Sequence, residues 1–273
     1  MYWWALAMIA HPGVQKRAQA ELDAVVGQSR VPTFSDAPSL PYIQAMVKEI
    51  LRWRPVLPLA LPHIATEDDW YEGMFIPKGT ICLANLWQCH LDPQYYGEDA
   101  ASFNPERFLD AHGKIIPGPA DTREEGHLAY GLGRRACVGK HAANESLFIY
   151  IATILWAANL ETVRDEDGKE VPFDTDTFVD TGAVLYVFRF HTMLNCDFRA
   201  TASQLPTSVG LHLGYLRHYQ YWRKRKRCSM YEPQIDGVSE IHIKHFLLYY
   251  CVSGKYRFHS MLRRLGCWVV TNS

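Results

Sequence analysis

Apolar side chains recur at helical spacing in the first part of the chain. Between Pro12 and Gly27 they stand at every third or fourth position, namely Val14, Ala18, Leu22 and Val25. Proline is tolerated in the first turn of a helix and glycine commonly follows the last, so the pattern predicts a helix over residues 12–26. The same spacing follows Tyr42 and ends at Pro55, which predicts a second helix. The apolar first residues are expected to be the end of another.

The pattern changes after the second predicted helix. Residues 56–87 place prolines and glycines between short apolar runs, which is typical of a small hairpin-rich sheet, and residues 92–136 are expected to be mostly loop. From Gly139 to Leu160 the chain is almost unbroken in apolar character, which indicates a helix buried on most sides. Short strands are expected again over residues 163–187. The predicted fold class is therefore mainly α with small β-sheets.

Composition narrows the class of protein. A chain of 273 residues with 48% hydrophobic and 21% charged residues fits one or two folded domains and excludes a disordered chain. Its seven cysteines are scattered and include no C-x-x-C pair, which indicates neither a disulfide framework nor a zinc site and favours a reducing, intracellular compartment. The longest apolar stretches fall short of the roughly 20 residues that a bilayer requires, so no stable membrane span is expected.

The charges are unevenly distributed along the chain. Residues 1–199 contain 17 Lys or Arg and 26 Asp or Glu, whereas residues 200–273 contain 11 and 3. The basic run Arg223–Arg227 stands beside tyrosine and tryptophan and could be interpreted as a nucleic-acid patch. A solvated tail, or sequence never selected to fold, is favoured, and no nucleic-acid partner is expected. His242 and His245 lack further ligands at zinc spacing, so satisfied or exposed histidines are favoured there.

The segment from Tyr130 to Gly139 carries the strongest chemical signal. A loop rich in glycine (Gly131, Gly133 and Gly139) presents Cys137 at the start of the long apolar helix. Helix starts favour the thiolate form of cysteine, which is the form that ligates metals. Glycines allow a backbone to approach a flat ligand closely. A buried free cysteine behind an irregular loop is the alternative that the residues alone leave open.

Two further segments carry charged residues, one on a predicted helix and one in a predicted loop. Glu49 and Arg52 have i, i+3 spacing and so lie on one helix face, although most such pairs are solvated surface pairs that contribute little. Arg107 lies in the proline-punctuated segment Asn104–Phe108, between the helix pair and the cysteine loop.

Taken in this order, these segments resemble the cytochrome P450 family of haem-thiolate monooxygenases over residues 1–199. Glu49 and Arg52 match the E-x-x-R helix of the family, and Arg107 matches its P-E-R-F segment. Residues 130–139 match F-x-x-G-x-R-x-C-x-G, with Tyr130 in place of phenylalanine. The sequences of residues 21–23 and 62–69 are most similar to those of fungal microsomal members of the O-methylsterigmatocystin oxidoreductase type.

The resemblance implies roles for individual residues. Cys137 would be the axial ligand of the iron of haem b, Arg135 and His63 would contact the haem propionates, and Tyr130 would pack beside the sulfur. Gly131, Gly133 and Gly139 would belong to the cofactor loop. The resemblance also implies a structural triad that supports this loop, consisting of Glu49, Arg52 and Arg107.

The resemblance also implies a reaction. The enzyme would insert one oxygen atom of O2 into a small hydrophobic metabolite, with electrons from an NADPH-cytochrome reductase, at the endoplasmic reticulum membrane and in fungal secondary metabolism. The apolar turn at residues 56–61 and the strands near residues 181–185 would line the substrate pocket.

The family is nearly twice as long as this chain. Residues 1–199 are therefore expected to be the carboxyl-terminal half of the fold, truncated at the amino end, followed by an irregular basic tail over residues 200–273 without a recognised domain. The alternative hypothesis is a non-catalytic fragment that retains the haem-ligand loop but lacks the oxygen-activating helix.

The tail is predicted to form no compact second domain. Its charge clustering interrupts any continuous apolar face, so at most short helices such as residues 241–252 are expected, with ready proteolysis. Limited proteolysis followed by mass spectrometry checks this, and rapid loss of residues 200–273 is expected. A protected fragment spanning these residues would instead indicate an independent domain and reopen the nucleic-acid interpretation.

Overall fold

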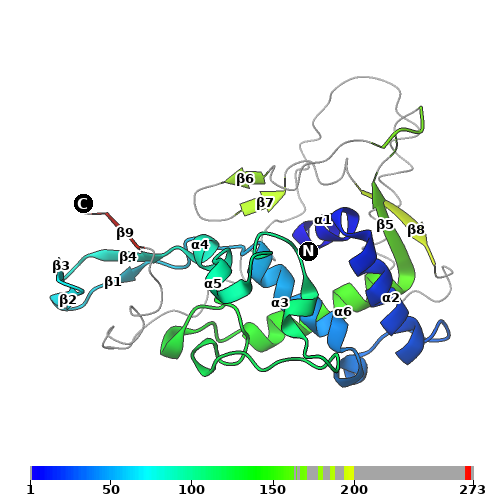
Figure 1. The fold of residues 1–273 in the computed structure, drawn as a ribbon, viewed down its shortest axis with the longest axis horizontal. Coiled ribbons are helices and arrows are strands. Elements are labelled where there is room, and N and C mark those ends of the chain that lie inside the picture. Colours follow the sequence, from blue (N-terminus) through cyan, green and yellow to red (C-terminus); the bar gives the residue numbers. More distant parts are fainter. Residues whose placement is uncertain are drawn as a thin grey trace, which may run out of the picture.

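The computed structural model describes residues 2–162, 164, 167–170, 178–180, 185–187, 194–199 and 268–271 (Figure 1). The helices are α1 Tyr2–Ala10, α2 Pro12–Val25, α3 Pro41–Trp53, α4 Leu86–His90, α5 Pro93–Tyr96 and α6 Lys140–Ala157. The strands are β1 His63–Ile64, β2 Asp69–Tyr71, β3 Met74–Ile76, β4 Ile81–Ala84, β5 Ala158–Thr162, β6 Phe178–Asp180, β7 Leu185–Val187, β8 Leu194–Phe198 and β9 Trp268–Thr271. Mixed helices and small sheets agree with the predicted class, and the predicted helices at residues 12–26 and after Tyr42 correspond to α2 and α3.

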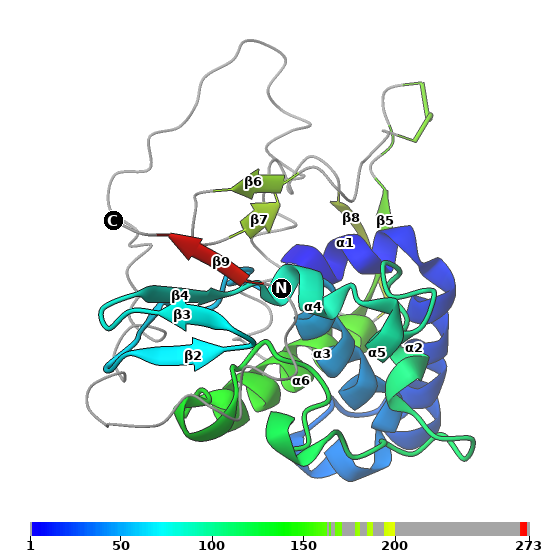
Figure 2. The ribbon, with the colours of Figure 1, turned by 60° about the vertical axis from the view of Figure 1, so that its left-hand side comes forward.

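The core lies where α1, α2, α3 and α6 pack together (Figure 2). Trp4, Leu22, Met46 and Trp156 come from these four helices and are each at most 1% exposed. Full burial of a large apolar side chain stabilises a fold by about 1.5–3 kcal/mol. The two tryptophans also use their indole N–H groups, since Trp4 donates to the sulfur of Met46 (3.0 Å) and Trp156 to the carbonyl of Gly27 (2.7 Å).

The last predicted helix ends three residues earlier than expected. The apolar run predicted a helix up to Leu160, but α6 ends at Ala157 and Ala158 is extended, with φ −152° and ψ 154°. Strand β5 begins there and pairs antiparallel with β8. The side-chain amide of Gln15 binds both backbone groups of Leu160, at 2.8 and 3.1 Å. Tertiary partners therefore hold this apolar segment in the extended conformation.

A separate small sheet lies at one end of the molecule (Figure 2). Its strand order is β1–β4–β9, and β2 and β3 form a neighbouring hairpin, which agrees with the hairpin-rich sheet predicted for residues 56–87. Strand β9 comes from the tail and pairs antiparallel with β4, with Cys82 opposite Val270. A strand at this point of the tail was not predicted.

Several predictions fall on residues that the structure does not describe. These include the basic run Arg223–Arg227, the two tail histidines, the helix over residues 241–252 and residues 181–184 of the expected pocket strands. Strands β6 and β7 pair antiparallel on either side of residues 181–184. In the described part of the chain, no helix combines the length and the apolar character needed to cross a membrane.

Candidate functional site

A fully buried ion pair lies on α3. Glu49 and Arg52 are both 0% exposed, and Arg52 donates to Glu49 through Nε and Nη2, each at 2.7 Å. The amphipathic pattern of α3 explains the position, because the i, i+3 spacing places both residues on the face that carries the buried apolar side chains. The pair is therefore a core feature and not the solvated surface pair that its spacing alone favours.

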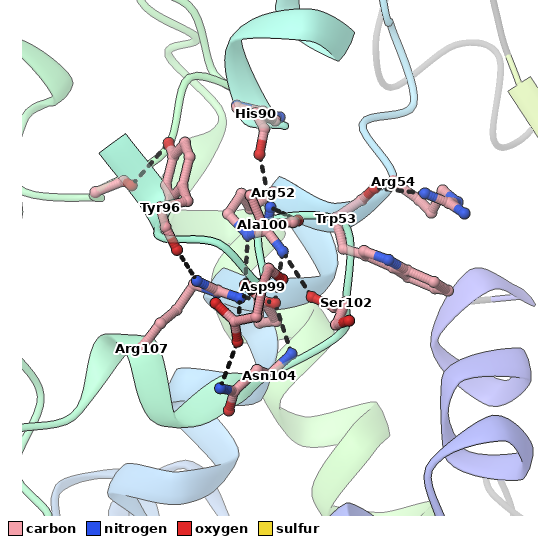
Figure 3. A network of polar contacts seen from close by, with 12 residues as sticks. Arg52, Trp53, Arg54, His90, Tyr96, Asp99, Ala100, Ser102, Asn104 and Arg107 are labelled. Atoms are coloured by element: carbon pink, nitrogen blue, oxygen red, sulfur yellow. Dashed lines mark hydrogen bonds and ion pairs between the residues drawn. The ribbon is translucent and has the colours of Figure 1, made fainter. Parts of the chain in front are cut away.

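The guanidinium of Arg52 also binds the main chain on both sides of α5 (Figure 3). It donates to the carbonyl oxygens of His90 at 2.6 Å, Ala100 at 2.7 Å and Ser102 at 3.0 Å. A planar guanidinium has five N–H donors in a fixed arrangement, so one side chain can fix several backbone carbonyls at once.

Arg107 completes this cluster from the 3₁₀ turn Pro105–Phe108. Its Nε lies 3.2 Å from Oε1 of Glu49, and it also binds the carbonyls of Tyr96 and Asp99 (Figure 3). The backbone N–H of Asn104 donates to the same Glu49 oxygen at 2.7 Å. The three residues predicted to form a triad therefore lie together, around one carboxylate.

The cysteine loop has the backbone geometry that its glycines permit. Gly131 and Gly133 have φ values of +72° and +57°, a backbone region that residues with a side chain rarely adopt. Gly139 has φ −86° and precedes α6, and a Cβ there would lie 3.8 Å from the sulfur of Cys137. The N–H of Cys137 donates to the carbonyl of Tyr130 at 2.8 Å, which closes the loop.

Tyr130 is anchored from the opposite side of this loop. Its hydroxyl donates to Oδ1 of Asn144 on α6 at 2.7 Å. Burial, followed by the negative charges of Glu125 and Cys137, raises the pKa of Tyr130. The hydroxyl that this residue adds relative to phenylalanine is thus satisfied, as a half-buried tyrosine requires.

His63 and Arg135 lie close enough to interact electrostatically. His63 is half-buried on β1, where it pairs with Cys82 of β4, and Arg135 is exposed at the end of the 3₁₀ turn Gly133–Arg135. Burial, followed by the positive charge of Arg135, lowers the pKa of His63. The sheet and the cysteine loop therefore bring together two groups suited to binding a carboxylate.

An acidic anchor of the loop escaped the sequence analysis. Glu125 is buried and binds Nζ of Lys140 at 2.9 Å, Nζ of Lys48 at 3.4 Å and the amide of Asn144 at 3.2 Å. Burial favours protonation of Glu125, but the hydrogen bond from Lys140, the charge of Lys48 and the amide of Asn144 outweigh it and lower its pKa. The four-residue spacing of Lys140 and Asn144 on α6 was the one visible signal.

Two buried histidines lie between the ion-pair cluster and the loop. The rings of His90 and His127 are each 1% exposed and 6.4 Å apart at nearly perpendicular orientation. His90 accepts a hydrogen bond from the N–H of Leu128 at Nε2, and His127 accepts one from the N–H of Ala129 at Nδ1. Burial, followed by the positive charges of Lys48, Arg52 and Lys140, lowers the pKa of His127 to about 3. Both histidines are neutral at pH 7, because burial also lowers the pKa of His90 well below its ordinary value.

A cavity of about 310 Å³ is lined by none of the predicted site residues. Aromatic and basic side chains at the end of α3 line it, together with residues 101–103, and the lining includes His11, Trp53, Arg54, Trp87 and Phe103. None of the predicted haem-loop residues contributes to it. The apolar side chains of the turn expected to line the substrate pocket include Val56, Leu59 and Leu61, which are 45%, 36% and 50% exposed.

Comparison with known proteins supplies the family. The sequence model described as Cytochrome P450 matches residues 1–181, about two thirds of the chain. The chain belongs to the cytochrome P450 family. The family implies a haem-iron cofactor, and the E-x-x-R pair and the cysteine loop lie within the matched residues.

Fungal cytochrome P450 monooxygenases are similar to this chain. Two from Armillaria gallica are 60% and 54% identical, over 78% and 72% of this chain and 41% and 38% of their own length. One from Postia placenta is 49% identical, over 74% of this chain and 38% of its own length. The chain thus spans about two fifths of the length of these curated relatives.

Removing Arg52 is expected to be strongly destabilising. The change Arg52→Ala leaves the carboxylate of Glu49 buried with fewer donors and should lower the free energy of unfolding by about 3–5 kcal/mol. Chemical denaturation monitored by tryptophan fluorescence measures this. The control is Arg164→Ala, which breaks an ion pair with Glu170 that is 62% and 60% exposed and should cost under about 1 kcal/mol. Equal stability of the two variants would contradict the buried assignment.

Acidification is expected to destabilise this P450 chain through His127. In the unfolded chain His127 binds a proton below pH 6.5, but in the folded chain only below about 3. Stability is therefore present above pH 6.5 and is lost as the pH falls toward 3, by about 2 kcal/mol at pH 5.

Unfolding curves measured between pH 7.5 and pH 5 check this prediction. His127→Asn keeps an acceptor for Ala129 but does not titrate, so its stability should depend less on pH than that of the unchanged chain. The control is the same substitution at an exposed histidine of α6, His141→Asn. Equal slopes for His127→Asn and the unchanged chain would show that His127 is protonated in the folded state.

Proposed function

We propose that this chain contributes the haem-ligand part of a haem-thiolate monooxygenase. The reaction would oxidise a small hydrophobic metabolite with O2, and an NADPH-cytochrome reductase at the endoplasmic reticulum membrane would supply the electrons. The observation that carries the proposal is the closed loop from Tyr130 to Cys137, with two glycines at positive φ and a long helix after it that is buried mainly in its second half.

The surroundings of Cys137 suit a metal ligand better than those of the other described free cysteines. Cys137 is half-buried, so its sulfur is shielded yet reachable, and Arg134 and Arg135 precede it. Cys82 is buried in β4, where burial raises the pKa of its thiol and so disfavours the thiolate. Cys89 lies within α4. Bound through a thiolate, haem iron supplies the binding and reductive activation of O2.

The groups around the loop would orient the cofactor. Arg135 is exposed and can donate two parallel hydrogen bonds to a propionate. His63 lies close enough to interact with the positive charge of Arg135. Tyr130 would hold the loop beside the sulfur through its hydrogen bond to Asn144. Glu49, Arg52 and Arg107 form one ion-pair cluster, and their proposed role is to support the loop.

Exposed apolar side chains near His63 support a proposal for the substrate class. Val56, Leu59 and Leu61 expose their side chains along the segment that leads to His63 on β1, and Ile64 does so directly after it. Apolar side chains that gather on a surface are typical of binding sites. A small hydrophobic metabolite is therefore the proposed substrate class, with these residues along one wall of its pocket.

Replacing Cys137 is expected to abolish thiolate ligation. The unchanged chain, supplied with haem, reduced and exposed to carbon monoxide, should give the red-shifted Soret band of thiolate-bound haem, and Cys137→Ser should eliminate that band. Absorbance spectra of the two proteins measure this directly.

The matched control is Cys89→Ser, which removes another half-buried thiol and should retain the band. A red-shifted band that survives in Cys137→Ser rules out the ligand assignment. Absence of any haem uptake by the unchanged chain would instead favour the non-catalytic alternative.

A further inference from the structure

His90 joins two parts of the molecule through two separate atoms. It is the last residue of α4 and is 1% exposed. Its main-chain carbonyl accepts a hydrogen bond from Nη1 of Arg52 at 2.6 Å, and its imidazole Nε2 accepts one from the N–H of Leu128 at 2.9 Å. The same residue is therefore fixed by the buried ion pair and in turn fixes the chain that enters the cysteine loop.

Leu128 lies at the start of the cysteine loop and forms its first turn. Its carbonyl accepts from the N–H of Gly131 at 2.8 Å, which forms the tight turn that the positive φ of Gly131 permits. The carbonyl of the intervening Tyr130 then accepts from the N–H of Cys137 at 2.8 Å. A continuous series of hydrogen bonds and short covalent steps thus connects Arg52 to the backbone of Cys137.

The imidazole is held in the form that this connection needs. Only a neutral imidazole has a nitrogen that can accept a hydrogen bond, and acceptance at Nε2 places the ring proton on Nδ1. Burial lowers the pKa of His90 well below its ordinary value and keeps the ring neutral, and the neighbouring His127 and the positive charge of Arg52 act in the same direction. The rings of Tyr96 and His127 lie edge to face against it, with centroids 6.2 and 6.4 Å away, and fix its orientation.

We propose that His90 is a positioning residue for Cys137: its imidazole transmits the fixed position of Arg52 to the loop that presents the thiol. The role of that thiol as a haem ligand rests on the proposed function, but the positioning of the loop does not. A side chain serving only to fill space would need no acceptor here, whereas the N–H of Leu128 has its hydrogen bond at Nε2.

The contacts of Glu125 provide a parallel attachment that does not replace this one. Glu125 binds Lys140 and Asn144 on α6 and Lys48 on α3, and so holds the helices on either side of the loop. It reaches the loop through Asn144 and the Tyr130 side chain, whereas His90 binds the main chain of Leu128 itself. Loss of the His90 acceptor should therefore loosen the loop even when the Glu125 cluster is intact.

The test compares two substitutions at position 90 in the full chain. His90→Phe retains a planar ring but removes the acceptor, and His90→Gln retains an acceptor oxygen at a similar distance from the backbone. The measured quantity is the rate at which iodoacetamide alkylates Cys137 in the haem-free chain, determined peptide by peptide by mass spectrometry.

His90→Phe is expected to raise the Cys137 alkylation rate by about tenfold, and His90→Gln by less than about threefold. Tenfold corresponds to about 1.4 kcal/mol, within the range for a buried N–H left without an acceptor. The stability control is Leu22→Ala, which opens the core on α2 away from the loop and should lower stability without raising this rate. The comparison is made at a temperature where every variant is folded by circular dichroism.

Two results would overturn the proposal. One is an unchanged Cys137 rate in His90→Phe, which would reduce His90 to a packing residue. The other is an equal increase in His90→Phe, His90→Gln and Leu22→Ala, which would trace the rate to global stability. Failure of the chain to bind haem would contradict the proposed function and leave this comparison intact, because the alkylation assay contains no haem.

Discussion

The guanidinium of Arg52 is the interaction on which the rest of the described structure depends. It is fully buried, paired with Glu49, and hydrogen-bonded to three backbone carbonyls between His90 and Ser102. A buried charge is tolerated only where its partners replace the water that it has lost. Because those partners are main-chain atoms of an irregular segment, the same contacts that satisfy the charge also fix the path of a chain with little regular structure.

The cysteine loop is held in position by two attachments, of which the first comes from this cluster. His90 binds the main chain at Leu128, and the Glu125 cluster fixes α3, α6 and, through Asn144, the hydroxyl of Tyr130. Because Gly131 and Gly133 have no Cβ, the loop can adopt many conformations in the unfolded chain, and both residues take positive φ values in the folded one. External attachment is therefore what reduces it to one conformation, as a ligand site requires.

The spacing of apolar residues predicted the helices well where proline or glycine marked their ends. Pro12 and Gly27 bracket α2 closely, and Pro41–Trp53 ends before the proline that the pattern identified. It was wrong at the end of α6, because an apolar run has no period that separates a buried helix from a buried strand. There the side chain of Gln15, far away in sequence, decided the outcome by binding Leu160.

By itself the sequence determined the identity of the chemistry-bearing residues, since a cysteine between glycines and arginines at a helix start and an E-x-x-R spacing are local patterns. Only the tertiary structure decided that Glu49 and Arg52 are buried, because i, i+3 spacing is the same on a solvated face. It also decided that Glu125, His90 and His127 surround the loop. Their importance comes from burial and from partners distant in the sequence, and neither is encoded in their immediate neighbours.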